Sequence, residues 1–521
     1  ASNNTAVGKS ALFANTTGAE NVGLGYISLL GNTTGANNTG LGRGTLASNT
    51  TADNNTGVGY NALNQNTTGT RNNALGANAA DSITTGSYNV AIGYNSLGVN
   101  QTGNSNTAVG DNTLNNNTAS QNTAIGENSM AANTSGSNNV ALGWASLDAN
   151  TTADHNTAVG AAALTANTTG ANNVAIGSGA LDANTTAGQN IAVGRDSLGA
   201  NTTGVGNIAM GHQALYTSTT ANYSTGIGYQ ALYDQTTGGD NVAIGLQAGE
   251  NITTGTANTL LSYAGRAITT HTRNVILGYG AGNAVNSSDN TFIGQNSGSA
   301  ITTGDANTIL GRFSGNEGGL DIRTSSNQIV LSDGDGNPRL RIDSTGRVMI
   351  DGSQTSVGPD GSSTDTNSTE IGKGYINLMR DDTAQIKQII FGKNGSEAGN
   401  ITTTSQTFYN SASDYRLKEN VVNLDNALSR LSQLQPKRFN WISDETNTLV
   451  DGFLAHEVSS VVPEAVGGEK DAVYPDDHEQ AGAIKVQVMD QSKLIPLLTK
   501  AIQEQQTIID DLKSRIETLE G

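Results

Sequence analysis

The chain has 521 residues, with 65 glycines, no cysteine and a formal net charge of −19 at pH 7. The absence of cysteine excludes disulfide bonds and thiolate metal sites, and the negative charge argues against binding to a nucleic-acid backbone or to anionic lipid. No run of about 18 apolar residues is present, so the sequence predicts no membrane-spanning helix.

From residue 1 to about residue 311 the sequence repeats a marker of the form Asn-x-Ala-Val/Ile-Gly, for example at residues 4–8 and 156–160. The closing glycine recurs with a 17-residue period that is shortened by one at three of the steps, and a serine takes its place at Ser262. Such a fixed period is typical of solenoids, in which each repeat forms one coil. The repeat is already in register at Ala1, without a secretion signal, so we expect the chain to be part of a longer protein.

The second half of each repeat reads Ala-Leu and then Asn-Thr-Thr-Gly, as in residues 163–170. Short β-branched runs between Gly and Asn favour strands and turns, and a repeat of this length is too short for a pair of helices. We therefore predict a β-solenoid or β-roll rod over residues 1–311, with nineteen coils and a length of roughly 90 Å at about 4.8 Å per coil.

Few apolar side chains are available to fill each coil. In the repeat around residue 160, the candidates are Ala158, Val159, Ala162 and Leu164. This core is thin for a chain on its own, so we predict that parallel copies share it in a homo-oligomeric rod. The marker resembles the head repeats of trimeric autotransporter adhesins, which are trimeric β-rolls, although their usual repeat is shorter.

The many Asn-Thr-Thr triplets have two interpretations. They match the N-glycosylation sequon, but we favour stacked ladders of Asn and Thr at turns. Aromatic residues are scarce in the repeats, and for that reason we expect no stacking platform for sugars along the rod.

The repeat fades over residues 312–412, where alternating segments at 328–332, 340–343, 375–378 and 386–391 predict strands. Between the first two, Asp333 and Asp335 belong to an Asp-Gly-Asp-Gly-Asn-Pro segment that suits either a Ca²⁺ loop or a hairpin turn. We favour the turn because no Glu follows at the twelfth loop position. The irregular sequence makes 312–412 the candidate receptor-contacting tip.

Residues 413–521 have an ordinary charged composition and a helical period, with one helix expected from Asn426 to Leu434. A heptad pattern follows at about 494–521 and predicts a coiled coil. Ile at a with Leu at d by itself leans toward two strands. The a positions are Ile495, Ile502, Ile509 and Ile516, and the d positions are Leu498, Gln505, Leu512 and Leu519.

The segment 413–420 reads Ser-Asp-Tyr-Arg-Leu-Lys-Glu-Asn and contains a possible reaction centre. The Ser413 hydroxyl needs a base to become a nucleophile, and the Lys418 amine can serve if burial or a nearby cation lowers its pKa. A spacing of five places the two on different faces of a helix or strand, so a working pair needs a bend or partners from different chains. The alternative is that Ser413 is a helix N-cap.

The C-terminal segment resembles the peptidase S74 family, the intramolecular chaperone domain at the end of endosialidases and many phage tail fibres. His456 departs from the pattern, where Gln is expected. The resemblance implies three chains and self-cleavage of the bond between Ala412 and Ser413, with Ser413 as nucleophile and Lys418 as proton shuttle. The matching motifs are residues 413–420, 439–441, 452–458, 463–464, 494–498 and 501–504.

The sequence therefore predicts a mostly β protein: a parallel homotrimeric rod, followed by a small α+β domain that ends in a coiled coil. The predicted function is that of an extracellular fibre, a phage tail fibre or tail spike, that attaches to a host receptor of glycan or protein nature and is anchored to a virion or cell surface. The alternatives are a bacterial surface adhesin and a polysaccharide-degrading spike, which would need a pair of carboxylates that the sequence does not locate. No cofactor or metal is expected.

Overall fold

A computed structural model describes residues 1–350, the backbone of five strands between 367 and 411, and residues 418–442, 446–473 and 484–521. The chain divides into two compact units, residues 1–384 and 385–521. The division falls inside the irregular region 312–412. Each unit is described by itself.

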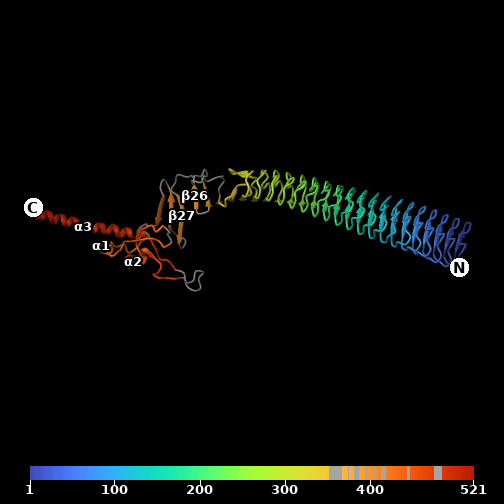
Figure 1. Ribbon diagram of the computed structural model, residues 1–521, viewed down its shortest axis with the longest axis horizontal. Coiled ribbons are helices and arrows are strands. Elements are labelled where there is room, and N and C mark those ends of the chain that lie inside the picture. Colours follow the sequence, from blue (N-terminus) through green and yellow to red (C-terminus); the bar gives the residue numbers. More distant parts are fainter. Residues whose placement is uncertain are drawn as a thin grey trace. The chain divides into compact units, whose positions relative to one another are not determined.

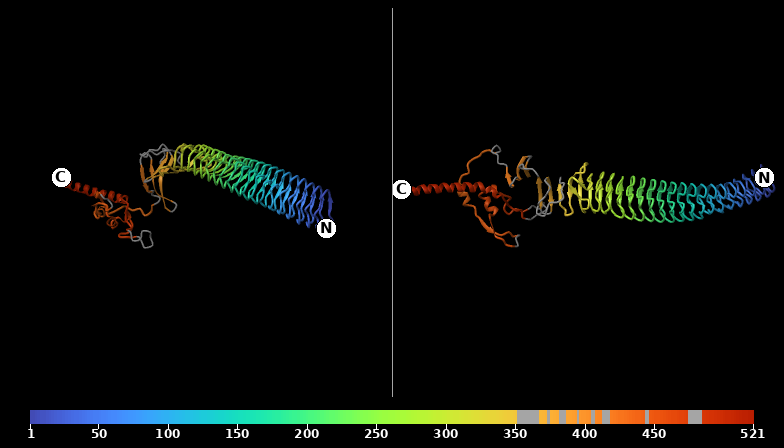
Figure 2. Two further views of the ribbon diagram at one scale, coloured as in Figure 1. Left: turned by 45° about the vertical axis from the view of Figure 1, so that its right-hand side comes forward. Right: turned by 90° about the horizontal axis from the view of Figure 1, so that it is seen from above.

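The first unit is a β-solenoid in which every coil contributes one three-residue strand (Figures 1 and 2). Each strand pairs in parallel with the next, so that Thr157 lies opposite Val174 of the following coil. The predicted β-solenoid with its 17-residue repeat is confirmed. The strands are β1 (Thr5–Val7), β2 (Val22–Leu24), β3 (Thr39–Leu41), β4 (Thr56–Val58), β5 (Asn73–Leu75), β6 (Val90–Ile92), β7 (Thr107–Val109), β8 (Thr123–Ile125), β9 (Val140–Leu142), β10 (Thr157–Val159), β11 (Val174–Ile176), β12 (Ile191–Val193), β13 (Ile208–Met210), β14 (Thr225–Ile227), β15 (Val242–Ile244), β16 (Thr259–Leu261), β17 (Val275–Leu277), β18 (Thr291–Ile293) and β19 (Thr308–Leu310).

A marker glycine follows every strand of the solenoid except β16, where Ser262 takes its place. Gly160 has a φ of +129°, and a Cβ there would lie 2.6 Å from the carbonyl carbon of Gly177 in the next coil. A side chain at this position would therefore combine an unfavourable backbone conformation with a clash. The glycine sets the corner and allows successive coils to approach closely.

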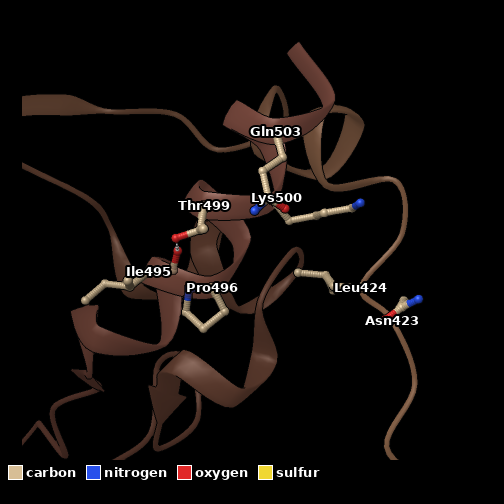
Figure 3. Close-up of a pocket in the computed structure, with 7 residues that line it drawn as sticks. All are labelled: Asn423, Leu424, Ile495, Pro496, Thr499, Lys500 and Gln503. Carbon is tan, nitrogen blue, oxygen red and sulfur yellow. Dashed lines mark hydrogen bonds between the residues drawn. The ribbon is translucent and has the colours of Figure 1, made fainter. Parts of the chain in front are cut away.

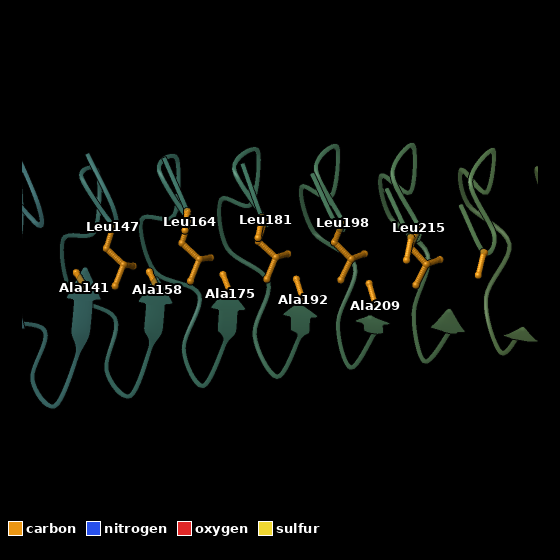
Figure 4. Packing of buried hydrophobic residues seen from close by; sticks show 14 of the residues in the cluster. Ala141, Leu147, Ala158, Leu164, Ala175, Leu181, Ala192, Leu198, Ala209 and Leu215 are labelled. Atoms are coloured by element: carbon orange, nitrogen blue, oxygen red, sulfur yellow. The ribbon is translucent and has the colours of Figure 1, made fainter. Parts of the chain in front are cut away.

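In most coils the core consists of two columns of small and medium apolar residues, an Ala at the strand centre and a Leu across from it (Figure 4). In the coil around residue 160, Ala158, Ala163 and Leu164 are fully buried. Val159 and Ala162 are only half-buried, so the prediction that they fill the interior is wrong. Side chains alternate along a strand, and a three-residue strand therefore turns only its middle residue inward.

Two ladders of buried asparagines run beside this core. Asn156 of the marker accepts a hydrogen bond from the backbone N–H of Asn173 (2.9 Å) and donates one to the Gly170 carbonyl (2.9 Å). Asn167 of the Asn-Thr-Thr triplet donates to the Asn150 side-chain oxygen (3.1 Å). Both side chains are fully buried, which confirms the ladder interpretation and removes Asn167 from reach as a glycosylation acceptor.

We predict that Asn167→Ala destabilises the solenoid by about 1–3 kcal/mol, the cost of leaving buried polar groups without a partner. The substitution removes the bond to Asn150 and the bond that the Asn167 oxygen accepts from Asn184 (2.8 Å). Denaturant unfolding of the full chain measures the effect. The exposed Thr169→Ala is the control, and equal unfolding midpoints for the two variants would show that the ladder contributes no stability.

The core changes composition in the last coils. At the strand centre, Ala gives way to large residues such as Phe292, while the facing position becomes glycine, such as Gly298. A Cβ on Gly298 would lie 2.5 Å from the Phe292 ring, so the exchange conserves volume, as close packing requires. The triplet asparagine is likewise replaced by buried Ile252, Ile268 and Ile301. These coils bury more apolar surface than the rest.

After the solenoid, β22 (Ile329–Ser332) continues the parallel stack on β19, and the chain then turns back in antiparallel strands, as predicted. In the turn, the Asp333 carboxylate accepts from the backbone N–H groups of Asp335 and Asn337 and pairs with Arg339 (2.7 Å). The hydrogen bonds from Asn337 hold the pKa of Asp333 well below its usual value. The hairpin interpretation is confirmed. The other strands of this unit are β20 (Asn316–Glu317), β21 (Leu320–Asp321), β23 (Pro338–Ile342), β24 (Val348–Ile350), β25 (Asn367–Gly372) and β26 (Tyr375–Arg380).

The second unit begins with an antiparallel sheet of β27 (Ile386–Lys393), β28 (Ser396–Thr403) and β29 (Thr407–Ser411). It continues as a small α+β domain that ends in one long helix. Within the described parts of the chain, no helix is both long and apolar enough to cross a membrane. The later elements are α1 (Ala427–Leu431), β30 (Lys437–Phe439), β31 (Val450–Gly452), α2 (Ala455–Ser459), η2 (Pro463–Ala465), β32 (Val466–Gly467), β33 (Val488–Met489), η3 (Gln491–Lys493) and α3 (Leu494–Glu520).

Candidate assembly and cleavage site

Of the predicted cleavage site, the described residues include only Lys418, whose side chain is exposed. Ala412 and Ser413 lie outside them. A lysine acts as a base only where its amine is desolvated or lies beside another cation. In the single chain the Lys418 side chain is exposed to solvent, so its amine is not desolvated. The Ser413–Lys418 dyad stays a prediction.

The helical domain after Lys418 has its own small core. The first turns of α3 bury Leu494, Leu497 and Ala501 against α1 and against Val458 of α2. Arg430 of α1 donates a hydrogen bond to the Val461 carbonyl (2.9 Å). These contacts fix the start of α3 on the rest of the domain.

Glu504 of α3 caps the beginning of α1, a helix far earlier in the chain. Its carboxylate accepts from the backbone N–H groups of Leu428 (2.8 Å) and Ala427 (3.2 Å). The bond from Leu428 lowers the pKa of Glu504. Asn426, the nearest local candidate, makes no such bond. Glu504 belongs to the motif at 501–504, but its capping role could not be predicted, because no local pattern links α3 to α1.

The opposite face of α3 is exposed in the single chain. The heptad residues Ile495, Ile502 and Ile516 are 60, 63 and 52% exposed. From Gln505 onward every residue of the helix is exposed. The predicted helix is confirmed, but its second half packs on nothing else that the structure describes, and isolated helices of such length are marginal in water. We call its a and d positions the seam.

Two cavities lie beside the start of α3. One, of about 220 Å³, is apolar, and the seam residue Leu498 lines it together with Phe453 and Leu494. The other, of about 580 Å³, is more open and is lined by Leu424, Pro496 and Lys500 among others (Figure 3). In the described parts of the chain, no three His, Asp or Glu side chains gather in a way that would hold a metal ion.

The motifs of this domain match a known family of chaperone domains. Residues 413–467 match the family model Peptidase_S74, the chaperone of endosialidase. The matched S74 segment begins at Ser413 and covers the elements from α1 to β32, of which α1 and α2 share a core with α3. Its departure from the expected motif, His456, is exposed on α2, so this residue leaves the packing within the chain intact. No curated protein and no solved structure matches the chain.

Proposed function

We propose that the chain is the rod of a phage tail fibre or tail spike, that three parallel copies are assembled by the S74 domain, and that this domain then releases itself by cleavage between Ala412 and Ser413. The rod would serve in attachment to a host surface. The S74 segment supports the chaperone role. An apolar stripe on the solenoid supports association with further copies of the chain, and the resemblance to the S74 family implies that there are three.

The apolar stripe runs along the outside of the solenoid and is formed by the third residue of every strand. Val7, Leu75 and Met210 are 55, 51 and 41% exposed. Soluble monomers rarely expose a continuous apolar patch of more than a few hundred Å², so the stripe needs a cover. Its members are Val7, Leu24, Leu41, Val58, Leu75, Ile92, Val109, Ile125, Leu142, Val159, Ile176, Val193, Met210, Ile227, Ile244, Leu261, Leu277, Ile293 and Leu310.

A second copy of the chain fits the stripe better than an unrelated partner does. The stripe has one apolar residue per coil, and a parallel copy repeats it at the same spacing in the same order. Closed symmetric association of identical chains is the common way to cover such a face. Three copies would meet around an axis, with their stripes inside and the three seams of α3 continuing the same symmetry.

The S74 domain would act by raising the local concentration of chains and setting their register. Parallel β-structure forms slowly because distant segments must meet before contacts repay the chain entropy. A coiled coil forms from local helices and holds the three chains side by side. The solenoids then pair coil by coil.

We predict that Ile509→Asp prevents assembly, because it places three charges in the seam, where each unpaired buried charge costs several kcal/mol. Thr507→Asp adds the same charge outside the seam and should leave assembly unchanged. Size-exclusion chromatography with light scattering measures the mass of both variants. An Ile509→Asp chain that assembles like the wild type would show that the seam does not direct assembly.

One observation favours the polysaccharide-degrading spike as a second candidate. Asp234 and Glu250 lie on successive coils, with the backbone N–H of Asp234 bonded to the Glu250 carbonyl (2.9 Å). Burial, and then the charge of Glu250, raise the pKa of Asp234, while Arg266 pairs with Glu250 (2.8 Å). Glycoside hydrolysis uses one protonated and one ionised carboxyl group. Oligosaccharide released from host capsule by the wild type but not by Asp234→Asn would establish this activity.

A further inference from the structure

The aromatic residues of the solenoid are not scattered. Most occupy the position that directly follows the marker glycine, which forms an exposed column along the coils. Other coils have Ala77, Ala161 or Ser178 there, so the fold does not require a ring at this position. Aromatic residues are scarce in the repeats, but those present are concentrated at this position. The column contains Tyr26, Tyr60, Tyr94, Trp144, Tyr229, Tyr263 and Tyr279.

The rings are densest over the five coils of β13 to β17, where a second column lies beside the first. His212 stacks on Tyr229 with ring centroids 5.5 Å apart, Tyr216 on Tyr233 at 5.5 Å, and Tyr263 on Tyr279 at 5.4 Å. We call these six residues the tyrosine face. Tyr229 and Tyr279 are 47 and 61% exposed. Within each stacked pair the ring spacing follows the coil spacing, and between the pairs Leu246 takes the column position in the coil of β15.

Charged groups capable of several hydrogen bonds lie among these rings. The Arg266 guanidinium lies over the Tyr263 ring, 4.7 Å from its centroid, and also bonds the Tyr263 hydroxyl. Its other side pairs with Glu250. Asp234 follows Tyr233 directly in the chain. The face thus combines flat apolar surfaces with carboxylate and guanidinium groups.

We propose that the tyrosine face binds a linear polysaccharide, an inference that rests on the attachment role proposed above and assigns it a site and a ligand class. The C–H faces of sugar rings pack against aromatic rings, and sugar hydroxyls pair with carboxylates and guanidinium groups. Rings stacked on neighbouring coils suit a ligand that itself repeats along its length.

A second copy of the chain is the other conceivable occupant, and the extent of the face argues against it. Parallel identical rods repeat the same contact at every coil, as the apolar stripe does from β1 to β19. The tyrosine face is confined to five coils. A contact between rods has no reason to end there, whereas a binding site contacts only a limited length of a polysaccharide.

The test uses the full chain carrying Tyr229→Ala and Tyr279→Ala together, two exposed residues whose loss leaves the core intact. The matched control is Tyr26→Ala with Tyr60→Ala, which removes two rings from the same column outside the face, 45 and 47% exposed. Binding is measured by biolayer interferometry on an immobilised panel of purified bacterial lipopolysaccharides and capsular polysaccharides. Sedimentation of the same samples reports assembly.

The wild type and the control should bind the same members of the panel, and the Tyr229/Tyr279 variant should bind them about tenfold or more weakly. Equal binding by all three proteins would contradict polysaccharide binding by the tyrosine face, but not the attachment role of the rod. A wild type that binds no member of the panel would overturn both. A Tyr229/Tyr279 variant with an altered mass would show that the face is a contact between copies and would also overturn the proposal.

Discussion

The wild-type chain is expected to appear on a denaturing gel as two fragments, residues 1–412 and residues 413–521, and the Ser413→Ala chain as one intact band. In the proposed reaction the Ser413 oxygen attacks the Ala412 carbonyl carbon, and the peptide C–N bond breaks as the acyl group moves from nitrogen to oxygen. Water then hydrolyses the ester. Ser413→Ala removes the nucleophile and little volume, so it should abolish cleavage and leave assembly intact.

Lys418→Ala and Lys418→Arg should both remain uncleaved. The Ala variant lacks the amine that shuttles the proton, and a guanidinium stays protonated and cannot act as a base. If Ser413 is instead only a helix cap, Ser413→Ala would cost about 1 kcal/mol and Lys418→Arg would be silent. A cleaved Lys418→Arg chain would show that another group is the base. An intact wild-type chain would contradict the proposed self-cleavage but not the chaperone role.

The exposure of Lys418 adds a condition to this prediction. Because a lysine must be desolvated or lie beside another cation to act as a base, cleavage should depend on neighbouring chains that cover the segment. The Ile509→Asp chain should therefore stay uncleaved as well as unassembled. Cleavage of an unassembled chain would show that one copy builds the reaction centre alone.

A chain that ends at Ala412 is expected to be monomeric or aggregated, whereas a fibre assembled from the full chain and then cleaved should keep its mass. The truncated chain exposes the apolar stripe with nothing to align it with a second copy. In the assembled fibre the stripes already cover one another. Size-exclusion chromatography compares the two preparations, and a truncated chain that assembles normally would contradict the chaperone role.

The core of the last coils bears on how the rod forms. Phe292 and Ile309, with Ile268 and Ile301 beside them, give these coils more apolar surface than the Ala, Leu and Asn of earlier coils. They are also the coils that precede the S74 domain in the chain. We expect pairing to start there and proceed toward residue 1.

The solenoid fold could be predicted from the sequence because the residues that determine each strand and corner lie within one short repeat, and the repeat recurs. The marker and its glycine define each strand and each corner. The predicted interior was partly wrong, since Val159 faces outward where the sequence pattern suggested a core residue. Which of two adjacent apolar residues points inward depends on the residue at which a three-residue strand begins. The sequence pattern of the repeat does not specify that residue.

The features that the sequence did not yield depend on residues brought together from separate coils or elements. Glu504 caps a helix distant in the chain. The pairing of Tyr263 with Tyr279, and of Asp234 with Glu250, appears only when coils are stacked. The S74 segment was recognisable because its motifs lie within short stretches, while its chemistry rests on Ser413, which lies outside the described residues.

The central claim is that three copies of the chain form one rod. Sedimentation equilibrium of the full chain carrying Ser413→Ala, which should stay uncleaved, tests it most directly. The account predicts a single species with the mass of three 53.3 kDa chains. A species with the mass of one or two chains would contradict it.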